Sequence, residues 1–237
     1  MIEMLRRFLR QKLGSLLVVI ALVCLVPLAA GTIIATPESS DNFPVTLALL
    51  MIAAGCVSRD ASSGALQMIL ARPIRRSSYV LGRFLGIAAT IALFQAVALA
   101  IALAVPKFLP VLGLGALDPA AALSGVAGTF LDALLIAAMI LFFSTFLPSY
   151  ADAFAYILLM FFLAAPAILG QLLKNAWLMN LGSVLRKNVA PSVPWPDLLR
   201  GREALGEASG RYVLALVVFL AAALIVFSRR EFAYGQD

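Results

Sequence analysis

Few side chains in this sequence could carry out catalysis or bind a metal. The 237 residues contain no histidine, which excludes histidine acid–base catalysis and histidine metal sites. Cys24 and Cys56 lie inside apolar runs, where we expect buried, inert thiols, and two cysteines cannot complete a four-cysteine zinc site. No GxxxxGK[ST] loop occurs, so the chain is not expected to bind ATP in the P-loop manner. We therefore predict neither an enzyme nor a metal site.

One carboxylate stands in an unusual place, in the middle of the apolar segment GTFLDALLIAAM. A charged side chain at the bilayer midplane costs roughly 2.5–3.5 kcal/mol, so Asp132 should face protein and find a partner. Candidate partners in other apolar segments are Gln95, Thr90 and Thr32. Two interpretations stay open, a substrate or proton site and a structural polar contact between helices. By contrast, Asp152 follows a turn sequence and is expected to cap a helix.

The composition places the chain in a membrane. Hydrophobic residues make up 63% of it and charged residues 13%, against about 45–50% and about 25% in soluble domains. Both disorder and an ordinary water-soluble enzyme are excluded by this excess. The formal net charge is +6. In a membrane protein the positions of the cations matter more than this sum, and the charge gives no reason to expect a nucleic-acid partner.

The apolar segments predict an all-α integral membrane protein that forms a single domain over residues 1–237. Residues 1–13 have apolar and basic residues at helical spacing, which indicates an amphipathic helix on the membrane surface. A spanning helix needs about 17–25 apolar residues. The second of the expected spans is short and could instead be re-entrant. The six expected spans are 14–36, 43–58, 80–105, 120–147, 152–173 and 211–228.

The cations predict the orientation. With both termini in the cytoplasm, 11 of the 18 Lys and Arg residues lie on the inner side, as the positive-inside rule favours. The connection 174–210 is long and polar, and its Trp177 and Trp195 suit a membrane–water interface. We therefore expect short helices on the outer face before the sixth span. The predicted location is a prokaryotic inner (plasma) membrane.

The loop between the second and third spans carries the most information. Ser62 or Ser63 can cap a short helix, an apolar face follows, and Pro73 ends the helix. A cationic turn then leads to Tyr79, which should anchor the start of the third span. A short helix with an apolar face needs either a protein partner or the inner leaflet to cover that face, and the residues alone favour neither.

The loop contains a run of spaced residues that form a motif: Asp60, Gly64, Ala65, Leu66, Ile69, Leu70, Arg72, Pro73, Ile74, Arg76, Tyr79, Leu81, Gly82 and Arg83. This motif resembles the signature loop of ABC-2 type transporter permeases. The similar layout covers the whole chain, whereas the motif covers about 25 residues. Two residues depart from the usual pattern, Asp60 for Glu and Ala65 for Thr.

The resemblance implies a function. Such permeases pair with a second copy or a homologue and dock on two separate ATP-binding cassette subunits, which bind ATP and magnesium. The loop then contains a coupling helix that sits in a groove of the ATPase, and the complex is expected to be an exporter. On this basis Leu66, Ile69 and Leu70 fill the groove, and Arg72 and Arg76 pair with acidic groups or phosphates. Gly64 and Pro73 set the helix ends, and Asp60 precedes the helix as an acidic residue.

Other functions stay open. A self-sufficient channel or proton-coupled carrier could use Asp132 as its ion site. A membrane subunit could also use the ATPase for force or signalling instead of transport. An intramembrane enzyme is disfavoured by the absence of histidine and of clustered carboxylates.

Overall fold

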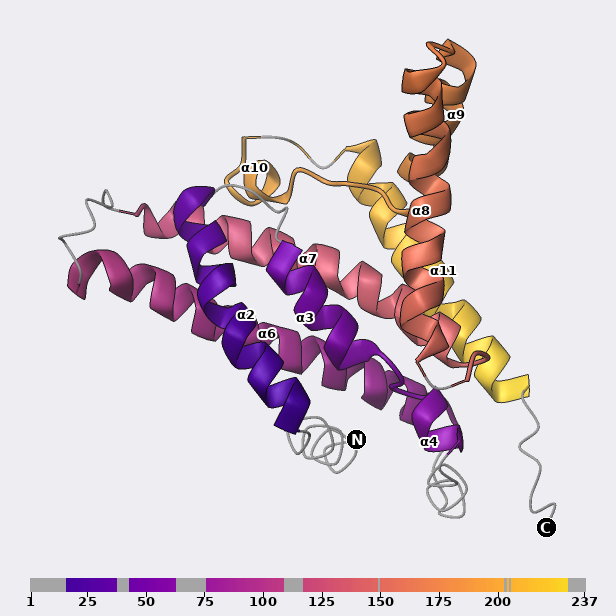
Figure 1. Cartoon of the computed structure of the whole chain (residues 1–237), viewed down its shortest axis with the longest axis horizontal. Helices are drawn as coiled ribbons and strands as arrows, with labels where there is room; N and C mark the ends of the chain where they lie inside the picture. Colours follow the sequence, from indigo (N-terminus) through magenta and orange to yellow (C-terminus); the bar gives the residue numbers. More distant parts are fainter. Residues whose placement is uncertain are drawn as a thin grey trace. The chain divides into compact units, whose positions relative to one another are not determined.

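The computed structural model describes residues 16–37, 43–62, 76–108, 117–148, 150–202, 204 and 206–229. Within these residues the regular structure is entirely helical (Figure 1). The predicted surface helix 1–13 lies outside the described residues. The helices are α2 (Leu16–Ala35), α3 (Phe43–Ala53), α4 (Ser58–Ser62), α6 (Arg76–Phe108), α7 (Pro119–Ser144), α8 (Ala151–Leu172), α9 (Ala176–Val189), α10 (Trp195–Leu199) and α11 (Glu207–Arg229).

The described helices confirm a multi-pass membrane protein. Five segments of the described residues are long and apolar enough to cross a membrane, and a shorter apolar segment, Val23–Ala35 in α2, precedes them. Each overlaps one predicted span. The predicted third span, 80–105, is longer in the structure, because α6 continues as helix through the polar residues at its start. Hydropathy locates the part of a helix that suits lipid, and the helix itself extends beyond that part.

The predicted second span is interrupted. α3 ends at Ala53, a turn covers Ala54–Val57, and α4 begins at Ser58. Gly55 has a φ of 67°, in the left-handed region that residues with a Cβ rarely adopt. The candidate span Phe43–Asp60 therefore contains a turn, in the segment 43–58 that was predicted as a short span or a re-entrant segment.

The chain divides into two compact units. The first comprises Met1–Ile52, Gly82–Ala137 and Pro194–Ala204, and the second comprises Ala53–Leu81, Ala138–Val193 and Leu205–Asp237. In the first unit, small and branched side chains such as Ala48, Leu49 and Ile91 are buried. In the second, the largest buried side chains include Tyr79 and Phe227.

Between α8 and α11 the chain forms two shorter helices, α9 and α10, as predicted for the connection 174–210. α9 packs against α8 as a helical hairpin within the second unit (Figure 1). Glycine allows this close approach, because a Cβ at Gly182 would lie 2.6 Å from the backbone nitrogen of Ala167. A Cβ at Gly170 would lie equally close, at 2.6 Å, to the backbone nitrogen of Met179. The hairpin therefore has a fixed register.

Candidate functional site

The structure describes the two ends of the predicted coupling loop. Asp60 lies in α4 and Arg76 begins α6. The intervening candidates lie outside the described residues: Gly64, Leu66, Ile69, Leu70, Arg72 and Pro73.

The first end of the loop is held by a buried hydrogen bond. The Tyr79 hydroxyl donates to Asp60 Oδ2 over 2.7 Å. Asp60 is 2% exposed and Tyr79 is 1% exposed, so the bond is shielded from water. The Tyr79 ring also stacks on Phe227, with ring centroids 5.4 Å apart and planes at 19°. The predicted anchoring role of Tyr79 thus rests on a polar contact to α4 and an aromatic contact to α11.

The second end of the loop is attached to α11 as well. Arg76 Nη1 donates to the backbone carbonyl of Ser228 over 2.8 Å. The last carbonyls of a helix lack partners inside the helix, and a cation there also suits the helix dipole. Arg76 and Tyr79 together fix the start of α6 against the last turn of α11.

The turn before α4 is held by two side chains that lie far away in the sequence. Asp152 Oδ2 accepts from the Gly55 backbone N–H over 2.8 Å. Ser144 Oγ accepts from the backbone N–H groups of Val57 and Ser58, over 3.0 and 3.1 Å. These bonds satisfy buried donors that the helix break would otherwise leave unpaired.

Asp152 behaves differently from the expected cap. The residue at the N-cap of α8 is Tyr150, which makes no side-chain cap hydrogen bond, and Asp152 lies inside the first turn. Its Oδ1 accepts from the Ala153 backbone N–H over 2.8 Å. Asp152 is 0% exposed, so one buried carboxylate joins the start of α8 to the α3–α4 turn.

We call this cluster in the second unit the loop anchor: Gly55, Val57, Ser58, Asp60, Tyr79, Ser144, Asp152 and Phe227. It joins the end of the second predicted span to the ends of α7 and α11 and the starts of α6 and α8. Sequence reasoning did not find Ser144 or Phe227. Ser144 follows a long apolar run, but nothing in that run indicates which distant backbone groups it serves.

The intramembrane carboxylate has a partner that the sequence did not suggest. Trp195 Nε1 donates to Asp132 Oδ1 over 2.8 Å. Of the expected candidates, Thr90 donates to Gly86 O and Thr32 to Ala29 O, each over 2.8 Å. The Gln95 side-chain nitrogen is buried with no hydrogen-bond partner among the described residues.

This contact changes the expectation for Trp195. Trp195 is 8% exposed, and Asp132 is the fourteenth residue of the 26-residue α7, so the indole lies beside the middle of that helix. The same connection is also tied to the start of α7, because Arg200 Nε donates to Ser124 Oγ over 3.0 Å. Trp195 is therefore a buried hydrogen-bond donor, whereas Trp177 is 68% exposed, and the interfacial position of both residues stays a prediction.

The described residues contain no candidate metal site and no disulfide bond. They contain no group of three His, Cys, Asp or Glu side chains that could hold a metal ion. Both cysteines are free, and Cys56 is buried as predicted. Cys24 is exposed, contrary to the prediction, so an apolar neighbourhood in the sequence did not ensure burial inside the protein.

Comparison with known proteins gives one match. Residues 28–186 match the family model described as ABC-2 family transporter protein. The match includes the loop anchor up to Asp152, Asp132 and most of the α8–α9 hairpin. Searches of curated proteins and of solved structures found no match.

Proposed function

The chain belongs to the ABC-2 family of transporter membrane proteins, and on this premise we propose that it is the permease subunit of an ATP-driven exporter. It docks on two ATP-binding cassette subunits through residues 59–79. ATP and magnesium are bound by those subunits. A second copy or a homologue completes the translocation path.

The observation that carries this proposal is the loop anchor. Asp60 and Arg76 flank the proposed coupling helix. Asp60 accepts a hydrogen bond from Tyr79 in α6, and Arg76 donates one to the last turn of α11. A force applied to the loop is therefore passed to the starts of α6 and α8 and to the ends of α7 and α11. A loop that merely rested on lipid would need no such fixed ends.

The loop anchor also supports six spans with both termini in the cytoplasm. α7 and α11 end at it, whereas α6 and α8 start from it, as alternating spans require. The loop 59–79 and the end of α11 thus share one side, to which the proposal assigns the cytoplasm.

Cysteine labelling tests this orientation. In a background without Cys24 and Cys56, Asn180→Cys in α9 should react with an impermeant maleimide in intact cells. Ser77→Cys and Arg229→Cys should react only after permeabilisation. All three side chains are exposed, so access to the reagent decides the result. Labelling of Arg229→Cys in intact cells would reverse the proposed orientation.

Tyr79→Phe tests transmission through the loop anchor. This change removes the hydroxyl that donates to Asp60 and keeps the ring that stacks on Phe227. Loss of a buried hydrogen bond to a carboxylate costs about 1.5–3 kcal/mol. We expect ATPase subunits to co-purify as before, with transport per ATP hydrolysed falling about threefold or more. Subunit composition by mass spectrometry and turnover in proteoliposomes measure the two effects.

Tyr156→Phe is the matched control. Tyr156 is also buried, and its hydroxyl makes no hydrogen bond among the described residues. Tyr156→Phe should leave transport per ATP hydrolysed unchanged. If Tyr79→Phe behaves like Tyr156→Phe, the loop anchor does not transmit the ATPase movement.

The rival function, a proton-coupled carrier at Asp132, makes a different prediction. An Asn at position 132 still offers an oxygen to the Trp195 indole but cannot carry a proton. We expect Asp132→Asn to keep transport within about twofold, and Asp132→Leu to destabilise the fold by about 1–3 kcal/mol because the buried indole N–H loses this acceptor. Transport assays measure the effect of Asp132→Asn, and thermal unfolding measures the loss of stability in Asp132→Leu. Loss of transport in Asp132→Asn at normal stability would favour the carrier.

A further inference from the structure

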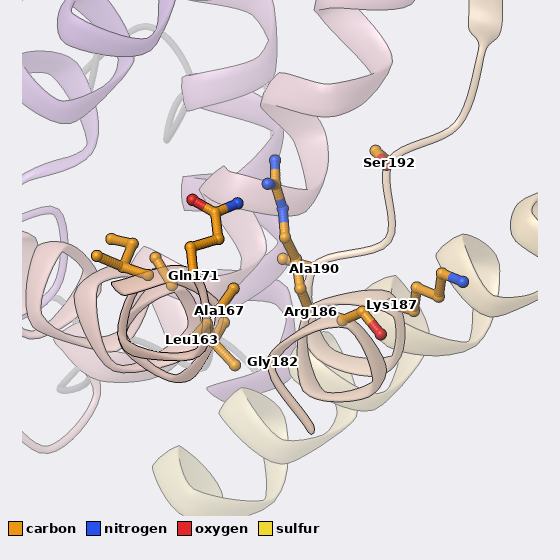
Figure 2. A pocket seen from close by; sticks show the side chains of 11 residues that line it. Leu163, Ala167, Gln171, Gly182, Arg186, Lys187, Ala190 and Ser192 are labelled. Carbon is orange, nitrogen blue, oxygen red and sulfur yellow. The ribbon is translucent and has the colours of Figure 1, made fainter. Parts of the chain in front are cut away.

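A groove with a polar end and an apolar floor lies between α8 and α9. Its volume is about 480 Å³, and eleven residues line it. Leu163, Ala167 and Ile168 of α8 supply apolar surface. In Figure 2 the side chains of Gln171 and Arg186 extend in the same direction from the two helices, whereas Lys187 extends away from them.

Arg186 in this groove has no acidic partner among the described residues. None of the described residues that line the groove is acidic. Arg186 takes part in none of the ion pairs formed among the described residues. Its guanidinium therefore presents five donors and a full positive charge to whatever enters.

The helical register places this charge beside a membrane helix. Gly182 contacts Ala167, and the helices run antiparallel, so Arg186, one turn further along α9, is level with about Leu163. Leu163 lies about 13 Å from the end of α8 at Leu172, by the rise of a helix. α8 is a candidate span. A cation next to such a helix is costly unless an anion pairs with it or the side chain extends to the interface.

We propose that this groove binds one anionic phospholipid. Its phosphate accepts hydrogen bonds from the guanidinium of Arg186. One acyl chain runs from there along α8, away from the hairpin turn, over the exposed side chains of Phe161 and Ile157. A groove of about 480 Å³ takes the phosphate and the upper part of one chain, and the rest of the lipid stays in the bilayer. Charge complementarity favours an anionic over a zwitterionic lipid, because the headgroup of the latter brings its own cation.

Native mass spectrometry of the purified full-length chain tests this assignment. The probes are phosphatidylglycerol and phosphatidylcholine with identical acyl chains, offered in equal amounts. We expect one phosphatidylglycerol to be retained in preference. Arg186→Gln should lower that preference about tenfold, because a charge-assisted hydrogen bond is lost. The measurement uses the chain without ATPase subunits, so its failure is separate from failure of the proposed function.

Arg229→Gln is the matched control, since Arg229 is an exposed arginine in the last turn of α11. Arg229→Gln changes the net charge by the same amount as Arg186→Gln does. It should keep the wild-type preference for phosphatidylglycerol. Lys187→Gln should reduce the preference less than Arg186→Gln does. Ala164→Trp, which fills the floor, should reduce retention of both lipids while the monodisperse elution profile is kept.

Three outcomes would overturn the proposal. Arg186→Gln could retain phosphatidylglycerol as the wild type does. Phosphatidylcholine could bind equally well, which would reduce the groove to an apolar surface. Millimolar inorganic phosphate could displace the lipid completely, which would make it a site for free anions.

Discussion

Leu66→Asp combined with Leu70→Asp should abolish assembly with the ATP-binding subunits. Both residues lie on the apolar face of the helix predicted within residues 59–79. Burying a leucine side chain contributes about 1.5–3 kcal/mol, so the pair supplies about 3–6 kcal/mol, a hundredfold or more in affinity. Two carboxylates placed in an apolar groove add a desolvation cost. Co-purification from membranes that also produce the ATPase measures the loss.

The control for this prediction uses the same helix. Gln67→Asp with Ala71→Asp adds the same charge on another face, since these positions lie about 100° and 140° around the predicted helix from Leu66. This variant should still assemble. Equal retention of the ATPase by both double variants would refute the coupling helix, whereas equal loss would show that added charge alone prevents binding.

Asp152→Ala should be the most destabilising single change in the loop anchor. The variant removes the acceptor for the Gly55 and Ala153 backbone N–H groups, and the Gly55 bond is buried. An unsatisfied buried donor costs about 1–3 kcal/mol, so we expect a loss of about 3 kcal/mol or more for the two together. The apparent Tm in detergent should fall on the order of 5–10 °C.

Two further variants separate the hydrogen bonds from side-chain size and charge. Asp152→Asn keeps one oxygen acceptor and should recover part of the stability. Glu207→Ala removes an exposed carboxylate that pairs with Arg211 in α11, and it should change the Tm by less than about 2 °C. If Asp152→Ala is no less stable than Glu207→Ala, the carboxylate does not hold the turn.

The membrane helices were predictable because lipid imposes a simple requirement. A segment that crosses the bilayer must be apolar over about 20 residues and must satisfy its own backbone, and both properties are local. The starts of α7 and α8 accordingly fall within one residue of the predicted spans. Short helices between α8 and α11 were also predicted, from the length and polarity of the connection 174–210, but the positions of α9 and α10 were not.

The interrupted second span was not predictable in the same way. The shortness of the predicted span 43–58 suggested a re-entrant segment, but the residues around Gly55 are apolar and do not mark where the turn lies. The turn exists because Ser144 and Asp152, 87 and 97 residues away, accept its free N–H groups. Such pairings depend on how helices meet, which the pattern of one segment does not contain.

The partner of Asp132 was missed for a related reason. Candidates were sought at the same depth in other spans, whereas the donor Trp195 belongs to a connection expected at the surface. The need for a partner was a correct inference from the cost of burial. The identity of that partner depended on a loop returning beside α7.

The close contact between Gly182 and Ala167 has a mechanical meaning. Ala167 directly follows Pro166, where α8 lacks one backbone hydrogen bond and is most easily bent. α9 braces α8 at this weak point, because backbone lies against backbone there and leaves no room for sliding. Bending of α8 at Pro166 therefore requires α9 to move with it.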